Sequence, residues 1–176
     1  PGTGMIGLPI AVALGAQIGR SECGLEVLRD VTPEAVERGR RMIDGRRIAI
    51  CLKEDHIPIG YINISPNESH DLGYGIHRNF WHQGIATEAG KCLLDHIQKV
   101  KTIPFITATH DKKNPNSGKV MKKLGMYYCY SYQEQWQPKN IPVIFRMYQM
   151  NLDGNVHKIY SQYWDQYPVH FVETNL

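Results

Sequence analysis

A short glycine-bearing turn that leads into a helix is the stretch of this sequence best suited to chemistry. It reads Trp81-His82-Gln83-Gly84-Ile85-Ala86-Thr87 and follows a strand-like segment. The first backbone N–H groups of a helix have no intrahelical partner and lie at the positive end of the helix dipole, so they can bind a pyrophosphate. Gly84 permits close approach, and Ala86 is small. Taken alone, a glycine at such a turn is more often only a turn.

A second cluster of polar and small residues follows further along the chain. It reads Asn114-Pro115-Asn116-Ser117-Gly118 and ends in Leu124-Gly125-Met126. Pro115 at a first helical position and Gly125 at a helix end predict a short helix over residues 115–124. Asn114 and Ser117 are, on local grounds alone, a turn residue and a capping residue.

In their order and spacing, these two segments resemble the acetyl-CoA-binding motif and the following Asn-x-x-Ser and Leu-Gly segment of the GNAT acetyltransferase superfamily. The resemblance covers about residues 54–152 and is nearest to the branch that includes ribosomal-protein N-terminal alanine acetyltransferases. Trp81 stands where most members have Arg or Gln. The resemblance implies acetyl-CoA as co-substrate, bound by Tyr74, Gly75, Ile76, Trp81, His82, Gln83, Gly84, Ile85, Ala86, Thr87, Asn114 and Ser117.

The same resemblance suggests where the catalytic groups lie. Several relatives have a carboxylate at the start of the strand before the cofactor turn, and Asp71 holds that position, with His70 as the substitute because its pKa is naturally near neutrality. Many members carry a tyrosine as general acid where this chain has Met121. The proton for the leaving thiolate must then come from water, Ser117 or Tyr128. Taken alone, Asp71 and His70 are more typical of solvated turn residues.

The strand after Asp71 contains two glycines, Gly73 and Gly75. They suit a bulge that frees backbone N–H groups for the thioester and the pantetheine arm, or they relieve crowding in a twisted sheet. The sequence does not decide between the two explanations.

Composition narrows the function classes. The 176 residues are 42% apolar and 21% charged, which is ordinary for one globular domain. With a net charge of +3 and dispersed Lys and Arg, the chain lacks the concentrated basic patch that nucleic-acid binding requires. The four cysteines and eight histidines are scattered, so we expect no metal site and no disulfide framework. The apolar run over residues 5–16 is too short to span a membrane, and we expect a cytoplasmic protein.

Hydrophobic patterning predicts an α/β (α+β) fold, a GNAT-like mixed and mostly antiparallel twisted sheet with helices on both faces. The expected strands span 47–52, 57–64, 71–76, 104–109, 126–135 and 143–152. The expected helices span 32–43, 86–100, 115–124 and 156–167, and the face of the second helix carries Ala86, Ala89, Leu93 and Ile97. We expect an atypical N-terminal segment over 1–53, the GNAT-like core over 54–152, and a helical extension over 153–176 that packs on the core.

Residues 1–50 resemble a fragment of an L-cysteine desulfidase-type lyase, although the chain lacks the cysteine cluster of an iron–sulfur centre. The main hypothesis is an acetyl-CoA-dependent N-acetyltransferase that acts on a primary amine, either a protein N-terminus or a small molecule, by direct attack in a ternary complex. One alternative is a catalytically degenerate CoA-binding domain. Another is a chimeric chain whose N-terminal part is a lyase fragment. A monomer and a homodimer are both compatible with the sequence.

Overall fold

The structure is a computed structural model that describes residues 47–53, 57–100, 103–174 and 176. These residues divide into two compact units. The first includes 57–66 and 73–86, and the second includes 67–72 and the chain from residue 87 onward. The predicted helix over 32–43 and nearly all of the lyase-like segment lie outside the described residues.

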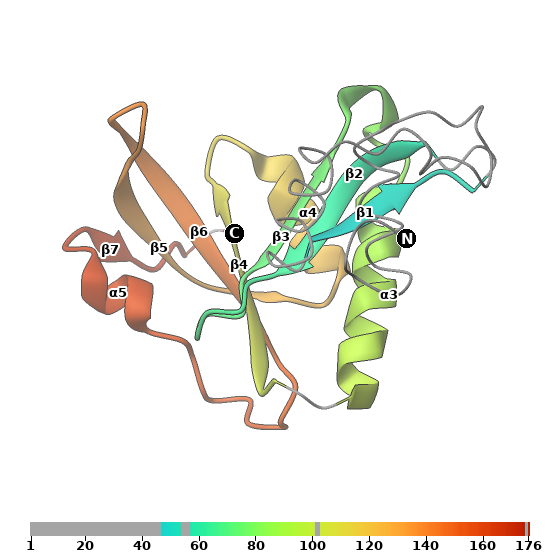
Figure 1. Ribbon diagram of the computed structural model, residues 1–176. Coiled ribbons are helices and arrows are strands. Elements are labelled where there is room, and N and C mark those ends of the chain that lie inside the picture. The colour runs from blue at the N-terminus through green and yellow to red at the C-terminus, as the bar shows by residue number, and fades with distance from the viewer. Residues whose placement is uncertain (1–46, 54–56, 101–102, 175) are drawn as a thin grey trace, which may run out of the picture. The chain divides into compact units, whose positions relative to one another are not determined.

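The first unit contains a three-stranded sheet in the order β1-β2-β3, in which β1 (Arg47–Cys51) pairs antiparallel with β2 (Pro58–Ile64) (Figure 1). The strand β3 (Leu72–Ile76) starts in the second unit and continues in the first. Added Cβ atoms on Gly73 and Gly75 would come within 2.8 Å of the side chains of Asn63 and Tyr61. These close contacts support the crowding explanation for both glycines.

The second unit is built on a four-stranded antiparallel sheet in the order β4-β6-β5-β7 (Figure 1). Its strands are β4 (Phe105–Asp111), β5 (Tyr127–Trp136), β6 (Ile141–Asn151) and β7 (His170–Phe171). Its helices are α3 (Ile85–Val100), whose first two residues belong to the first unit, α4 (Pro115–Lys123) and α5 (Gln162–Gln166). The predicted mixed α+β class with antiparallel sheets is confirmed. None of the described helices is long and apolar enough to cross a membrane.

The helices α4 and α5 pack on opposite faces of this sheet. Gly118 of α4 lies against the His110 ring, and an added Cβ there would be 2.6 Å from the His110 Nε2 atom. Trp164 of α5 packs edge-on against Tyr130, with ring centroids 5.5 Å apart. His110 on β4 is paired with Arg146 on β6, and Arg146 is in turn paired with Ser131 on β5. Ser131 is the chain neighbour of Tyr130. Because successive side chains of a strand point to opposite faces, His110 and Tyr130 face opposite ways.

The end of α4 follows the sequence prediction. Gly125 has a φ of +87°, and its N–H donates to the Lys122 carbonyl at 3.0 Å. The Met126 N–H donates to the Met121 carbonyl at 3.1 Å. These two hydrogen bonds form a Schellman motif, which a glycine completes without steric cost. The chain thereby turns directly from α4 into β5.

Two helix predictions were wrong in part. On α3, the buried residues are Gly90, Leu94 and Ile97, so of the predicted face only Ile97 is fully buried. The helix expected over 156–167 forms only as α5. The buried Gln149 side chain explains the shorter helix, because its Nε2 donates to the Lys158 carbonyl and its Oε1 accepts from the Tyr160 N–H. Those backbone groups are thus bonded to a strand residue and not to a helical turn.

The C-terminal segment is held to the sheet by the carboxylate of Glu173, whose side chain is 14% exposed. It accepts two hydrogen bonds from Arg146, at 2.9 and 2.6 Å, one from Ser131 at 2.8 Å and one from Lys112 at 3.0 Å. The Glu173 N–H donates to the Tyr128 hydroxyl at 3.0 Å. These bonds, Arg146 foremost, lower the pKa of Glu173 from 4.5 to about 2.

We predict that Glu173→Gln lowers the free energy of unfolding at pH 7 by about 2 kcal/mol, because charge-assisted hydrogen bonds to Arg146 and Lys112 are lost. The folded pKa lies below the ordinary value, so this stabilisation is complete above pH 4.5 and declines as the pH falls toward 2. Urea unfolding at several pH values measures the difference. Asp95→Asn, at an exposed position of α3, is the control. A difference that stays constant with pH would contradict the assignment.

Candidate functional site

In the first unit, the turn between β3 and α3 is fixed by hydrogen bonds to strand backbone. It contains one turn of 3-10 helix, η2 (Arg78–Phe80). The indole Nε1 of Trp81 donates to the Ile76 carbonyl at 2.7 Å, and the His77 N–H donates to the Ile59 carbonyl at 2.7 Å. Trp81, at the family's Arg or Gln position, therefore ties the turn to the end of β3 while its ring stays 59% exposed.

Gly84 precedes the first residue of α3 and has a φ of +81°. An added Cβ there would meet no atom within 4 Å, so the glycine is required by the backbone conformation and leaves open space beside the start of the helix. Gly84 has no side chain that could cap the first N–H groups of the 16-residue helix. These features fit a phosphate-bearing ligand such as acetyl-CoA, which needs free N–H donors and close approach.

In the second unit, Asp71 forms an isolated parallel β-bridge with Thr107 of β4. The Thr107 hydroxyl oxygen, in a fully buried residue, lies 2.8 Å from the Ser69 carbonyl oxygen and 3.2 Å from Asp71 Oδ1. Burial raises the pKa of Asp71 from 3.8 to about 7, although the Thr107 hydrogen bond opposes the shift. The Asp71 carboxyl is therefore poised to exchange a proton near neutral pH.

The Thr107 hydroxyl has one proton and two acceptors. When it donates along the shorter contact to Ser69, Asp71 completes the second hydrogen bond only by donating from a protonated carboxyl. When Asp71 is ionised, the hydroxyl must turn toward it and leave the Ser69 carbonyl. The Thr107 hydroxyl therefore gives the Asp71 carboxylate only a shared hydrogen bond, and desolvation outweighs it.

His70, the other predicted base, lies in a left-handed conformation with a φ of +46°. Its N–H donates to the Asn67 carbonyl at 3.0 Å, and its ring packs on Phe105 with centroids 5.5 Å apart. These contacts give His70 a role in the turn that presents Asp71.

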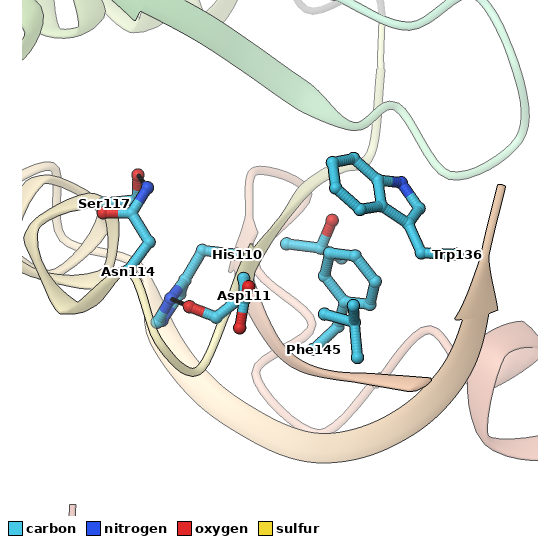
Figure 2. A pocket seen from close by; sticks show the side chains of 8 residues that line it. His110, Asp111, Asn114, Ser117, Trp136 and Phe145 are labelled. Carbon is cyan, nitrogen blue, oxygen red and sulfur yellow. Dashed lines mark hydrogen bonds between the residues drawn. The ribbon is translucent and has the colours of Figure 1, made fainter. Parts of the chain in front are cut away.

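A pocket of about 240 Å³ opens where β4 ends and α4 begins. Figure 2 shows Trp136 and Phe145 on one side of it and Asn114 with Ser117 on the other. Asn114 Nδ2 donates to Ser117 Oγ at 3.1 Å, so the structure brings these two predicted residues together. The lining residues come from β4, the start of α4, β5 and β6: Thr109, His110, Asp111, Asn114, Ser117, Trp136, Val143 and Phe145.

His110 is a pocket residue that the sequence did not single out. It is 5% exposed, its Nδ1 lies 2.8 Å from the Asp111 carbonyl oxygen, and its Nε2 has no hydrogen-bond partner. Burial lowers its pKa, and Arg146 lowers it further. A neutral ring that donates from Nδ1 to the Asp111 carbonyl fits these contacts. The predicted strand stopped at Thr109, and the alternation that marks His110 as inward-facing extends two residues further.

The predicted residues thus fall into three groups. Those of the cofactor turn lie in the first unit, from Tyr74 to Ala86, and Thr87 is the first residue of the second unit after them. Asn114 and Ser117 meet at the pocket, and His70 and Asp71 lie beside β4. Met121 is 1% exposed in the core, so this position supplies no acid. In the described part of the chain, no group of three or more His, Cys, Asp or Glu could hold a metal ion.

Comparison of the sequence with models of protein families assigns the chain to a family. The acetyltransferase (GNAT) domain matches residues 27–127, more than half of the chain. The chain belongs to the GNAT acetyltransferase family. The match includes the cofactor turn, Asp71 and the helix α4, so each candidate group lies within the GNAT domain.

Solved structures agree with this assignment. The ribosomal-protein-S5-alanine acetyltransferase of Vibrio fischeri has a TM-score of 0.64 at 16% identity, covering 84% of this chain and 91% of that one. A GNAT acetyltransferase of Bacillus anthracis has a TM-score of 0.60 at 19% identity, covering 82% and 89%. The microcin C7 self-immunity acetyltransferase MccE, solved with acetyl-CoA and AMP, has a TM-score of 0.58 at 15% identity, covering 81% and 88%. At these identities the likeness shows the GNAT fold.

The N-terminal segment is similar to a different kind of protein. It matches a UPF0597 protein of Bacteroides fragilis, 65% identical over 65 residues, and one of Bacteroides thetaiotaomicron, 66% identical over 64 residues. These matches cover 37% and 36% of this chain and 15% of each relative. The chain thus spans a small part of the curated relatives it matches. The matches fall on the segment where the sequence resembles a lyase fragment.

We predict that the Asp71 carboxyl titrates near pH 7, which carbon-detected NMR of the side chain measures. The folded pKa exceeds the ordinary value of 3.8, so the free energy of unfolding should fall as the pH rises from about 4 to above 7. Asp71→Asn keeps an acceptor for Thr107 but cannot ionise. At pH 8 it should therefore be more stable than the native chain by an amount on the order of 2 kcal/mol. A titration midpoint near 4 would refute the assignment.

Proposed function

We propose that this chain is an acetyl-CoA-dependent N-acetyltransferase that transfers acetyl to a primary amine by direct attack in a ternary complex. Membership in the GNAT acetyltransferase family supports acetyl transfer in general. The observation that carries the proposal is Asp71, a carboxyl whose burial raises its pKa to about 7 beside Thr107. A group with this pKa can take a proton from an acceptor amine at neutral pH.

The cofactor would be held by the chain's own backbone and amide groups. The N–H groups that follow Gly84 would bind the pyrophosphate, and Asn114 would meet the pantetheine arm. Structural neighbours solved with acetyl-CoA or coenzyme A support this choice of co-substrate. When bound, acetyl-CoA supplies the thioester carbonyl that the amine attacks.

In this proposal Asp71 acts on an amine in the pocket through ordered water, because Asp71 is not among the residues that line the pocket. It contacts Thr107, and Thr109 of the same strand lines the pocket. Residues two apart on a strand share a face and are separated by about 7 Å. A water between the acceptor amine and the carboxylate can therefore relay the proton. Deprotonation makes the nitrogen nucleophilic, which is the step that the enzyme must promote at neutral pH.

Protonation of the leaving thiolate falls to Ser117 or to water. Met121 has no proton to give. The Tyr128 hydroxyl lies 3.0 Å from Ser131 Oγ and accepts the Glu173 N–H at 3.0 Å, so it belongs to the C-terminal anchor. Ser117 lines the pocket and accepts a hydrogen bond from Asn114, which orients its hydroxyl.

The acceptors of structurally similar enzymes support an amine acceptor. They include acetyltransferases of ribosomal-protein N-termini and a spermidine N-acetyltransferase, so the acceptors among them are protein N-termini and a small amine. A catalytically degenerate CoA-binding domain is the second candidate, favoured by Met121 at the usual tyrosine position. It would bind acetyl-CoA without turning over any amine.

Calorimetric titration with acetyl-CoA tests the cofactor site. We expect micromolar binding to the native chain and at least tenfold weaker binding to Gly84→Glu, which places a bulky negative charge in the open space beside α3. Gly84→Ala is the matched control, because it shares the strain of a positive φ without the charge and should lose less affinity. If acetyl-CoA does not bind the native chain, the proposal is contradicted. If Gly84→Glu binds acetyl-CoA as tightly as the native chain, the turn is not part of the cofactor site.

A further inference from the structure

Four aromatic side chains form a continuous row beside the candidate general base. In order along the row they are Phe105, Tyr160, Tyr163 and Tyr132, and successive ring centroids lie 5.6, 5.4 and 5.1 Å apart. The first ring also packs on His70, with centroids 5.5 Å apart. We call this row the aromatic wall. Its two middle members come from the C-terminal segment, and its two ends come from β4 and β5.

The aromatic wall lies on the side of the sheet where Asp71 is held. Phe105 and Thr107 are two apart on β4, so their side chains share a face. The Ser69 carbonyl oxygen lies 2.8 Å from the Thr107 hydroxyl oxygen, and the Ser69 side chain is a hydrogen-bond partner of Tyr163. Ser69 is only 5% exposed. Tyr163 therefore reaches the turn that presents Asp71 to Thr107.

Backbone hydrogen bonds hold the C-terminal part of the wall on the sheet. The Tyr160 N–H donates to Gln149 Oε1 at 2.8 Å, and the Tyr160 carbonyl accepts from the Tyr130 hydroxyl at 2.7 Å. Gln149 is fully buried and is the ladder partner of Thr107. The backbone at Tyr160 is thus fixed beside the strand that Asp71 contacts. These bonds do not depend on the rings of the wall, so a ring can be changed while the segment keeps its place.

The three tyrosines of the wall are neutral at neutral pH. Burial raises the pKa of each hydroxyl, to about 12 for Tyr163, and the nearby Asp71 carboxylate raises it further. The influence of Asp71 on Tyr132, Tyr160 and Tyr163 places all three near the carboxyl. A titration near pH 7 on this side of the sheet therefore does not arise from the tyrosines.

Charged groups also contact the wall from other elements. Glu68 and Glu134 act on the hydroxyls of the wall tyrosines, and Lys158 places its Nζ 5.6 Å from the Phe105 ring centroid. The pKa of Asp71 is raised by burial and lowered by the Thr107 hydrogen bond. Exclusion of water, to which the wall contributes, is therefore the larger influence on the carboxyl.

Most of the wall lies beyond the part of the chain that defines the family. The GNAT domain matches residues 27–127, whereas Tyr132, Tyr160 and Tyr163 follow that range. Asp71 itself lies inside it. The surroundings of the carboxyl are thus completed by side chains outside the matched domain.

We propose that Tyr160 and Tyr163 are positioning residues for the general base: the aromatic wall that they complete excludes bulk water from one side of the Asp71 carboxyl and holds the turn at Ser69 against Thr107. This proposal rests on the proposed function, in which Asp71 receives the proton of the acceptor amine. Low-dielectric surroundings disfavour the ionised carboxyl, so the wall sets the pH at which the base becomes active. Ordered water on the pocket side still relays the proton.

A carbon-detected NMR titration of the Asp71 carboxyl, in the full chain without cofactor, tests the wall. Tyr163→Leu removes the ring, and we expect the titration midpoint to fall by about one pH unit or more as water reaches the carboxyl. Tyr163→Phe keeps the ring and should restore the midpoint to within about 0.3 pH unit of the native value. Tyr160→Leu, which retains the backbone bonds of the segment, is a second variant and should shift the midpoint in the same direction as Tyr163→Leu.

Tyr167→Leu is the matched control. Tyr167 also stacks on Tyr132, with ring centroids 4.8 Å apart, but the groups that act on its hydroxyl are burial and Glu134 rather than Asp71. Loss of this ring should loosen the same cluster and leave the Asp71 midpoint unchanged. An equal fall in Tyr167→Leu would overturn the inference, because the effect would then be general loosening. An unchanged midpoint in both Tyr163→Leu and Tyr160→Leu would also overturn it.

The pH dependence of acetyl transfer separates this inference from the proposed function. In Tyr163→Leu the apparent pKa of the rate should fall together with the NMR midpoint, and the limiting rate at high pH should fall about threefold because the base is weaker. If the midpoints move as expected but the native chain releases no thiol from acetyl-CoA, the proposed function fails while the control of Asp71 by the wall stands. If acetyl transfer occurs with the same pH profile in Tyr163→Leu, the inference fails and the proposed function stands. Circular dichroism of each variant verifies the fold.

Discussion

The parallel contact between Asp71 and Thr107 is the interaction on which the account of this protein depends. It places an ionisable carboxyl against Thr107 of a buried strand. The single hydroxyl proton of Thr107 is shared between this carboxyl and the Ser69 carbonyl. Burial without a full set of donors raises the pKa of Asp71 to about 7. A solvated aspartate would be ionised at that pH and would be a weak base. The desolvation that disfavours the ionised carboxyl thus also brings its pKa to a value at which it can accept a proton at neutral pH.

The strand β4 supplies side chains both to the site and to its support. Thr107 contacts Asp71, Thr109 and His110 line the pocket, and His110 also lies against Gly118 of α4. On β6, alternation along the strand sets Phe145 at the pocket and Arg146 in the Glu173 anchor. One period-two pattern therefore supplies both a polar cavity and the packing that keeps it in shape. The C-terminal segment completes the arrangement, because Glu173 forms ion pairs with Arg146 and Lys112, the chain neighbours of two pocket residues.

The sequence predicts those parts of the site that depend on local conformation. The turn at Gly84, the start of α4 at Pro115 and its end at Gly125 follow from backbone preferences, and the structure has all three. Features set by distant partners could not be predicted. The Gln149 amide shortens the last helix, Glu173 binds Arg146 across the sheet, and Trp136 lines the same pocket as the end of β4. His110 was missed because β4 runs two residues beyond the predicted strand.

The most direct test of the central claim is release of the coenzyme A thiol from acetyl-CoA with primary amines, followed from pH 5 to 9 for the native chain and Asp71→Asn. The account predicts acetyl transfer whose rate rises with pH through an apparent pKa near 7, the value to which burial brings Asp71. In Asp71→Asn the rate should fall at least a hundredfold, and this rise near pH 7 should disappear. No thiol release with any amine, or an unchanged pH profile in Asp71→Asn, would contradict the account.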